Sequence, residues 1–442
     1  MPERNMIGPI AAAAVGLGAI IGAGIFVLSG TSIALAGADA LIAFAIVGIV
    51  AIIIALELAE LGSLLPNEKG ASYSYTYKAF GSELGFITGA LRYMALTVSI
   101  SAIALGFGSY LSNLAFGSAA GAYPIIFAIV LIVALAFVNM LGIKKAAHTD
   151  LGLVLIKIGI LLIFVAFAII VVFSRPGGIP SISFSASGSA WSSIFAASVV
   201  VFFAYSGFQS IATLTERIRG GARGFVRAIL GAVTISIVVY VLVVLAMLLI
   251  VPSGSYHNLL TADPLSYVLG LARAPSWLRI LTDIGALVAT ASAALAMILS
   301  SSRSLYQMSE DHLLPKFFRK YNRNRDTAEN GIIVSAIIGI AMLFSGNIYV
   351  IASIANFGLM FDYLLIGFDV MHYRHQGVKS PFRMPLYPYL PIIATVLLLL
   401  FFTGLTKEVL EIGVILVILL LVVYYTLREV RDKKVVRVKL FN

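Results

Sequence analysis

The residues best placed to do chemistry are ionisable side chains that interrupt long apolar segments. Lys157 is the clearest of them, because it follows Asp150 by seven residues, about 10 Å along a helix from the polar end of its segment. A lysine in hydrocarbon costs about 2.5 kcal/mol or more. Two interpretations stay open: an ammonium that exchanges protons as part of a function, or a side chain that extends back to the membrane interface.

Four further charged residues lie in or beside apolar segments. Asp362 is a second candidate for proton chemistry, either as a relay or as a residue that faces a polar vestibule. Glu57 and Glu60 end an apolar segment, where we expect contacts with a gate or a loop. Arg92 is expected at an interface.

The sequence contains no constellation typical of an enzyme. Cysteine is absent, and the five histidines (His148, His257, His312, His372 and His375) form no metal-binding motif. No His-Glu-x-x-His sequence, nucleophile elbow or pair of intramembrane aspartates is present. We therefore expect no catalytic residues, no metal and no cofactor.

The composition is that of a chain in lipid. Of 442 residues, 60% are hydrophobic and 11% charged, and the mean hydropathy is +1.03. Long apolar runs can satisfy their backbone hydrogen bonds in a bilayer as helices, so we predict one all-α polytopic domain over residues 1–442. The net charge of +10 does not indicate nucleic acid binding, because basic loops set membrane orientation.

Twelve apolar stretches of about 17 residues or more are bounded by charges or by Pro and Gly. They cover 7–36, 40–61, 85–112, 123–142, 151–173, 191–218, 226–251, 279–307, 331–345, 348–371, 387–404 and 408–427. The first is longer than the core of a cleavable signal, which has about 7–15 residues, so we expect it to remain as a span.

Basic residues favour one side of this arrangement. With Arg92 and Lys157 assigned to spans, 24 of the 30 Lys and Arg fall in loops on one side and 4 on the other. The positive-inside rule then predicts a protein of the cytoplasmic membrane with both termini in the cytoplasm. Residues 428–442 would form a basic cytoplasmic tail.

Glycine recurs in the middle of the first span, although each instance costs a helix about 1 kcal/mol relative to alanine. Close packing through Gly18 and Gly22 would explain it, and so would a broken helix. The sixth span repeats the feature in Phe203-Ala-Tyr-Ser-Gly-Phe208. Five spans per half give the two segments opposite orientations, as an inverted repeat requires. Broken helices there would offer N–H groups to a carboxylate and carbonyls to an ammonium, which together describe a zwitterionic amino acid.

Four stretches carry a family resemblance. They are Gly16–Phe26; Glu57–Pro66 with Gly70, Tyr73, Tyr75 and Ala79-Phe-Gly81; Phe203–Phe208 with Glu216; and Ser302–Tyr306 ending at Leu314-Pro315. In order and spacing the sequence resembles the amino acid, polyamine and organocation transporter superfamily. The resemblance implies a five-plus-five inverted repeat like that of the leucine transporter, here over 7–173 and 191–371, followed by two helices in 387–427.

The resemblance also implies a substrate site and a coupling site. The backbone of Gly22, Ala23 and Gly24 would hold a carboxylate. Carbonyls of Ile20, Phe203, Ala204 and Ser206 would accept an amine, with Phe203 as an aromatic gate. Lys157 is similar to the fifth-span lysine of the proton-coupled branch, whose ammonium replaces a coupling sodium. Its partners would be the Gly18 carbonyl and the hydroxyls of Thr290 and Ser292.

We therefore expect a secondary active transporter of amino acids that works by alternating access. The implied pocket contains no acid, which favours neutral substrates, and the proton is favoured over sodium as coupling ion. An exchanger, or a transporter of cationic amino acids or polyamines, stays open; a channel or a membrane enzyme is a distant alternative. The expected partners are the amino acid and the lipid bilayer, and the sequence does not indicate an oligomeric state.

Overall fold

The computed structural model describes residues 6–65, 72–118, 121–142, 146–174, 182, 184, 190–209, 211, 218–325, 327–345 and 348–439, with the backbone alone for 146–151, 348 and 427–439. Pro66, Gly70 and Glu216 of the family motifs lie outside these residues, as do residues 440–442 of the expected tail. The described chain is helical apart from turns, loops and two isolated β-bridges.

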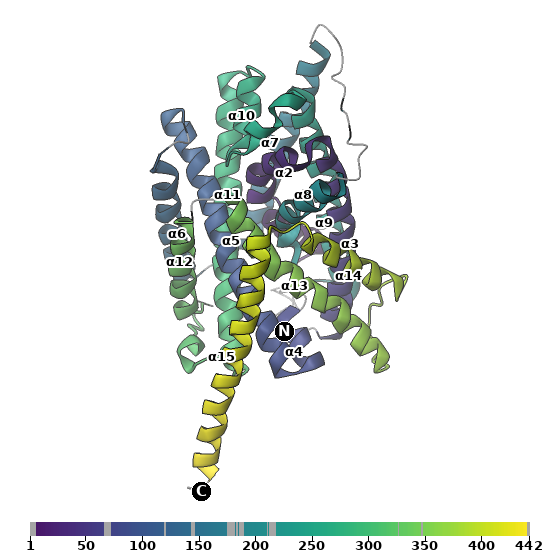
Figure 1. The fold of residues 1–442 in the computed structure, drawn as a ribbon, viewed down its shortest axis with the longest axis vertical. Helices are drawn as coiled ribbons and strands as arrows, with labels where there is room; N and C mark the ends of the chain where they lie inside the picture. The colour runs from purple at the N-terminus through teal and green to yellow at the C-terminus, as the bar shows by residue number, and fades with distance from the viewer. Residues whose placement is uncertain are drawn as a thin grey trace.

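The helices follow one another along the chain as shown in Figure 1. They are α1 (Pro9–Ile20), η2 (Gly24–Leu28), α2 (Ser29–Ala36), η3 (Gly37–Asp39), α3 (Ala40–Leu64), α4 (Ser72–Phe80), α5 (Ser82–Phe116), α6 (Tyr123–Leu141), α7 (Ala146–Ser174), α8 (Ala190–Tyr205), α9 (Gly221–Ile250), η5 (Ser253–Leu259), α10 (Pro264–Leu271), α11 (Ser276–Glu310), η6 (Lys316–Arg319), α12 (Glu329–Leu343), α13 (Ile348–His375), α14 (Tyr389–Phe402) and α15 (Lys407–Lys439).

Nine helical stretches of the described chain are long and apolar enough to cross a bilayer. One of them, Pro9–Leu64, has 56 residues, and a continuous helix of that length would measure about 84 Å. A bilayer core is only about 30 Å thick, and the turn at Gly37–Asp39 divides the stretch into two. Two shorter apolar helices, α12 and α14, have 15 and 14 residues. The chain is a multi-pass membrane protein.

Local sequence explains where individual helices begin and end. Pro9 opens α1 at a position where its missing N–H costs no hydrogen bond. Gly117 ends α5 with φ +70°, and its N–H donates to the Asn113 carbonyl at 2.8 Å. The left-handed backbone at that position favours glycine.

The helices pack in two groups. On one flank α5 packs against α6, α11 and α12 (Figure 1). In the second group α1 and α3 pack on α9, while α2 and α3 pack on α8. Helices α7 and α13 join the groups, since α7 contacts α1 and α11, and α13 contacts α8 and α5. Residues far apart in sequence therefore meet between the groups.

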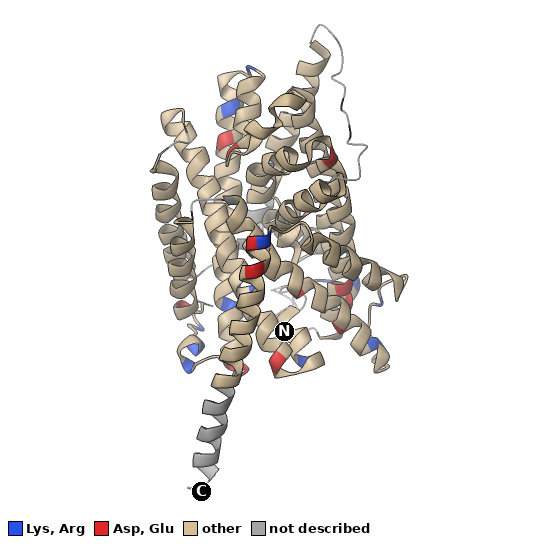
Figure 2. Cartoon of the chain, in the orientation of Figure 1, with Lys and Arg blue, Asp and Glu red and all other residues tan. Residues whose placement is uncertain are grey.

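Two short helices that the sequence analysis does not predict mark opposite ends of the molecule. Helix α4 lies at one end, against α5 and α13, and α10 lies at the other, before α11 (Figure 1). We call these the α4 end and the α10 end. Lys and Arg gather toward the α4 end (Figure 2).

Candidate functional site

The first and sixth spans are both interrupted at the glycines that the sequence analysis singles out. Helix α1 ends at Ile20, and helical structure resumes as η2 at Gly24 and continues into α2. Helix α8 ends at Tyr205 and is followed by a 3-10 turn over residues 206–209. Because the first N–H groups of a helix have no partner within it, the start of η2 offers hydrogen-bond donors.

The two interruptions lie directly against each other. A Cβ atom at Gly24 would lie 2.2 Å from Ala204 Cα, and one at Gly207 would lie 2.3 Å from the carbonyl carbon of Ala19. No side chain fits at such distances, so only glycine permits this contact between backbones. Helix breaking occurs here, and the close packing that the sequence leaves as an alternative for Gly18 and Gly22 occurs as well. An added Cβ would lie 3.0 Å from Val154 Cγ2 at Gly18 and 2.6 Å from Ala293 Cβ at Gly22.

All seven residues that the resemblance assigns to substrate are brought together in the buried core: Ile20, Gly22, Ala23, Gly24, Phe203, Ala204 and Ser206. The four carbonyls among them that the resemblance assigns to the amine already accept hydrogen bonds from hydroxyl groups. Tyr240 donates to the carbonyls of Ile20 at 2.6 Å and Ala204 at 3.1 Å. The Ser206 hydroxyl donates to the Phe203 carbonyl at 2.9 Å, and the Tyr363 hydroxyl donates to the Ser206 carbonyl at 3.3 Å.

Sequence reasoning missed Tyr240 and Tyr363. Each is a tyrosine within an apolar span, a common occurrence, and the one available signal is that a buried phenol needs a hydrogen-bond partner. Only the packing of α9 and α13 against the interruptions shows which carbonyls those partners are.

Lys157 is buried, with 1% of its surface exposed. Its Nζ donates to the Gly18 carbonyl at 3.1 Å and to the Ser292 hydroxyl at 2.5 Å. The ammonium therefore joins α7, α1 and α11, and it does not extend to an interface. Thr290, the other expected partner, donates its hydroxyl to the Ala286 carbonyl of its own helix at 2.7 Å.

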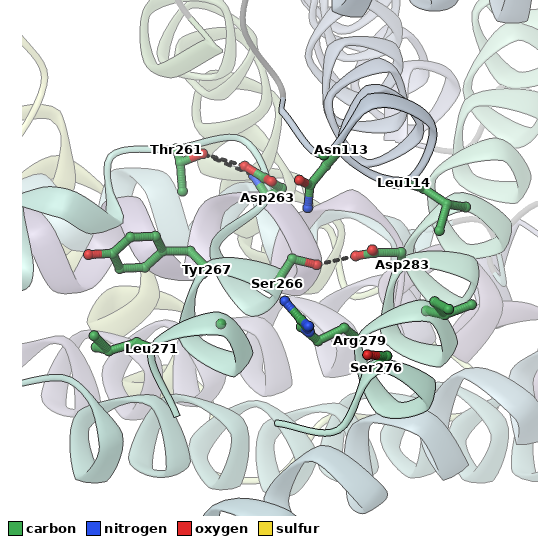
Figure 3. Close-up of a pocket in the computed structure, with 13 residues that line it drawn as sticks. Asn113, Leu114, Thr261, Asp263, Ser266, Tyr267, Leu271, Ser276, Arg279 and Asp283 are labelled. Atoms are coloured by element: carbon green, nitrogen blue, oxygen red, sulfur yellow. Dashed lines mark hydrogen bonds between the residues drawn. The ribbon is translucent and has the colours of Figure 1, made fainter. Parts of the chain in front are cut away.

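A cavity of about 550 Å³ opens at the α10 end (Figure 3). It is lined by the end of α5, the loop before α10, α10 itself and the beginning of α11, and none of the predicted site residues lines it. Two buried carboxyls face it: Asp263 accepts a hydrogen bond from Thr261, and Asp283 accepts one from Ser266. Burial raises the pKa of the Asp263 carboxyl.

Arg92 forms the centre of a buried polar cluster near α4. Its exposed fraction is 4%, and its Nη1 lies 3.1 Å from Asp362 Oδ2. The same nitrogen donates to the Ser72 hydroxyl at 2.5 Å and to the Gln209 side chain. Because a buried charge requires a partner, α5 and α13 are held together here, with α4 and the turn after α8 joined to them.

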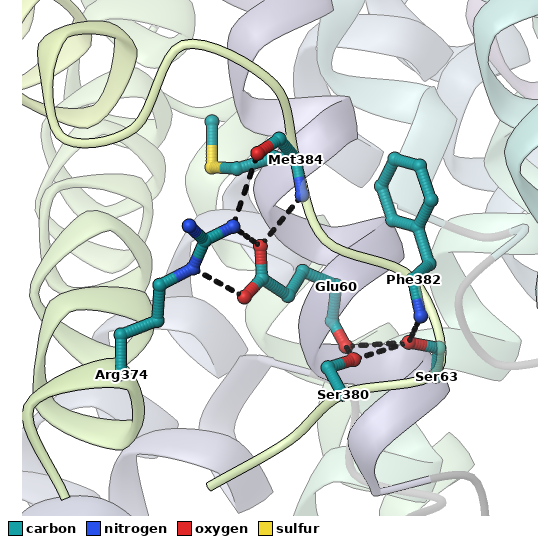
Figure 4. Close-up of polar contacts among 6 residues, drawn as sticks. All are labelled: Glu60, Ser63, Arg374, Ser380, Phe382 and Met384. Atoms are coloured by element: carbon teal, nitrogen blue, oxygen red, sulfur yellow. Dashed lines mark hydrogen bonds and ion pairs between the residues drawn. The ribbon is translucent and has the colours of Figure 1, made fainter. Parts of the chain in front are cut away.

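A second charged contact closes α3 against α13 at the α4 end (Figure 4). Arg374 donates from Nε and Nη2 to the two carboxylate oxygens of Glu60, both at 2.7 Å. The N–H of Met384 donates to the same carboxylate at 2.8 Å, and Ser63 and Ser380 bond 2.7 Å apart beside it. The expected loop contacts of Glu60 are confirmed.

Glu57, one turn before Glu60, has different surroundings. It is fully buried, and neither carboxyl oxygen has a hydrogen-bond partner in the described part of the chain. Asp369 lies close enough to interact with it electrostatically, while the Thr76 hydroxyl donates to Asp369 at 2.8 Å. The described residues contain no group of three or more His, Asp or Glu that could hold a metal ion.

The sequence of this chain is similar to those of several known proteins. A family model described as amino acid permease matches residues 7–425. The methylthioribose transporter of Bacillus subtilis (strain 168) is 29% identical over 402 residues, which cover 86% of this chain and 84% of that protein. The branched-chain amino acid permease of the same organism is 28% identical, with 86% and 83% covered. That of Lactococcus lactis subsp. cremoris (strain MG1363) is 26% identical, with 95% and 94% covered.

Proposed function

Because this chain belongs to the amino acid permease family, we propose that it carries neutral amino acids across the cytoplasmic membrane by proton-coupled alternating access. The observation that carries the proposal is the contact between the two interrupted spans, at Gly24 with Ala204 and at Gly207 with Ala19. Interrupted helices that meet inside a membrane bundle supply the backbone donors and acceptors that a zwitterion requires.

The carboxylate of the amino acid binds the N–H groups of Gly22, Ala23 and Gly24, beside the start of η2, where the helix dipole favours negative charge. The Gly22 N–H, which donates to the Ile20 carbonyl at 2.8 Å, gives up that bond when the carboxylate binds. The ammonium binds the carbonyls of Ile20, Phe203, Ala204 and Ser206, while Phe203 covers the site as its gate. A carbonyl oxygen has two lone pairs, so the ammonium can join a single hydroxyl donor or replace it. The Ile20 carbonyl accepts from both the Tyr240 hydroxyl and the Gly22 N–H, so there the ammonium replaces one of them.

Helix packing supports a five-plus-five repeat within a twelve-span arrangement. The first span packs on the fifth and seventh (α1 on α7 and α9), and the sixth packs on the tenth and second (α8 on α13 and α3). Exchanging the two halves, 7–173 and 191–371, converts one set of contacts into the other. The same exchange relates the contact of α7 with α11 to that of α13 with α5.

The α4 end is assigned to the cytoplasm, because Lys and Arg gather there (Figure 2). With this orientation, the Arg92–Asp362 cluster and the Glu60–Arg374 contact close the cytoplasmic side. Alternating access requires both to open when the substrate is released inside.

Lys157 couples transport to the proton. Its ammonium bonds the Gly18 carbonyl, two residues before the end of α1, and reaches Ser292 on α11. Loss of the proton removes the charge that holds these helices together, so proton release and movement of the first span are linked. Bonding to Gly18 and Ser292 gives a buried charge the partners it needs.

The test is uptake of radiolabelled neutral amino acids into proteoliposomes, with and without an inward proton gradient. Lys157→Ala is expected to abolish gradient-driven uptake. Lys407→Ala is a suitable control, because that side chain is 90% exposed, and it is expected to behave as the parent. Gradient-independent counterflow in the parent and both variants would contradict the proton role and indicate an exchanger, and absence of any uptake or counterflow would contradict neutral amino acid transport.

A further inference from the structure

Among the described residues that line the cavity at the α10 end, two have carboxyl groups, Asp263 and Asp283, and one has a guanidinium, Arg279. Asp263 and Asp283 are 8% and 4% exposed, and each accepts a hydroxyl hydrogen bond. A carboxylate has about four acceptor positions, so both retain capacity toward the cavity. Charged groups removed from water are destabilised unless they are paired, and a bound cation would pair these.

Arg279, the basic side chain among the described residues that line the cavity, lies one helical turn before Asp283 on α11 (Figure 3). A guanidinium binds carboxylates through paired N–H donors. Two carboxylates beside one guanidinium therefore suit a ligand that has an ammonium and a carboxylate. The cavity volume of about 550 Å³ lies within the range of small-molecule sites, about 300–1,000 Å³.

The cavity is physically connected to the interrupted first span. Helix α10, which forms part of its wall, packs on η2. Tyr110 interacts electrostatically with Asp263 and Asp283, and its hydroxyl donates to the Phe26 carbonyl in η2 at 2.5 Å. A ligand in the cavity would therefore change the surroundings of the helix that begins at Gly24.

We propose that this cavity is a second, outer binding site for the amino acid, with the ammonium between Asp263 and Asp283 and the carboxylate on Arg279. The amino acid binds here before it reaches the interrupted helices. The identity of the ligand rests on the proposed function, whereas the preference of the cavity for an ammonium group rests on its two carboxyls alone.

The absence of cysteine from the chain permits a direct test. Asn113→Cys introduces a single thiol into the cavity wall. Its reaction rates with a cationic reagent, trimethylammonioethyl methanethiosulfonate, and an anionic one, sulfonatoethyl methanethiosulfonate, are measured on the purified full chain by mass spectrometry. Asp263→Asn and Asp283→Asn are then added, singly and together, because asparagine keeps the size of the side chain.

The ratio of cationic to anionic rate is expected to fall about tenfold or more in the double variant, because charge in a cleft changes association rates by about 10 to 1,000-fold. The ratio for each single Asp variant is expected to lie between that of Asn113→Cys alone and that of the double variant. Glu408→Gln with Glu411→Gln removes two exposed carboxyls that do not line the cavity, and it is expected to leave the ratio unchanged. An unchanged ratio in every Asp263 and Asp283 variant would overturn the proposal.

Protection of the thiol identifies the ligand. L-leucine is expected to slow labelling more than leucinamide, which lacks the carboxylate, and N-acetylleucine, which lacks the ammonium, is expected to give no protection. Equal protection by N-acetylleucine would overturn the ammonium site. If proteoliposomes take up no amino acid but the ratio of cationic to anionic labelling rate falls in the Asp variants, the proposed function is refuted and the ammonium site stands. Uptake with an unchanged ratio would refute the outer site alone.

Discussion

The hydroxyl of Tyr240 lies 2.6 Å from the carbonyl oxygen of Ile20, where the first helix of the chain ends. The same hydroxyl lies 3.1 Å from the Ala204 carbonyl, one residue before the end of α8. One phenol therefore donates to carbonyls of both interrupted spans. Because it has a single proton, it fully satisfies only one carbonyl at a time.

Tyr240→Phe removes this donor and keeps the ring. We expect the variant to lose about 0.5–1.5 kcal/mol of unfolding free energy, because one buried hydrogen bond is removed while the Ile20 carbonyl keeps the N–H of Gly22 at 2.8 Å. Thermal unfolding of the purified protein in detergent measures the loss. Tyr205→Phe is the matched control, since the Tyr205 hydroxyl lies 3.4 Å from its acceptor, the Phe44 carbonyl, and a smaller effect is expected. Equal losses in the two variants would refute the special role of Tyr240.

Gly24→Ala is expected to destabilise the protein by about 3 kcal/mol or more and to abolish uptake. The added Cβ would lie 2.2 Å from Ala204 Cα, and a contact with backbone cannot be relieved by a rotamer change. Gly231→Ala in α9 is the control, because its Cβ meets nothing within 4 Å. That substitution is expected to stabilise the helix by about 0.5–1 kcal/mol. Normal uptake by Gly24→Ala would show that the interrupted spans do not need this contact.

Loss of either partner of the Arg92–Asp362 pair leaves a buried charge. Arg92→Met and Asp362→Asn are each expected to cost about 3–5 kcal/mol of stability, and the double variant less than the sum. The parent, the two single variants and the double variant form a double-mutant cycle, and thermal unfolding measures the stability of each. The exposed pair Lys320–Glu329, with Lys320 65% exposed, is expected to contribute about 0–1 kcal/mol in a parallel cycle. Additive losses at Arg92 and Asp362 would mean that the two groups do not interact.

Glu57 and Glu60 are expected to respond in opposite directions to the same substitution. Glu57→Gln should raise the free energy of unfolding by about 1 kcal/mol and with it the unfolding temperature. It removes the charge of a buried carboxyl whose oxygens have no hydrogen-bond partner in the described chain. Glu60→Gln should lower the free energy of unfolding by about 3 kcal/mol, because Arg374 and the Met384 N–H lose a carboxylate. A loss of stability in both variants would show that Glu57 has a charged partner.

The sequence by itself determined the fold class, the family and the positions of the two interruptions. Hydrocarbon requires every backbone group to be bonded within the protein, so apolar length alone indicates helices. Glycine in the middle of a span is costly, so its repetition at Gly22, Gly24 and Gly207 indicates where the helices change. The contacts of Lys157 with Gly18 and Ser292 were also predicted, although through family resemblance and not from spacing.

The tertiary structure alone decided which polar groups meet across the bundle. Arg92 and Asp362 are 270 residues apart, and Tyr240 lies 220 residues after Ile20. Hydrophobic periodicity describes how one helix meets lipid or protein, but it contains no information on which distant helix supplies a partner. The short helices α4 and α10 were missed for the same reason. They are held by contacts with α13 and η2, because a helix of so few residues gains most of its stability from packing.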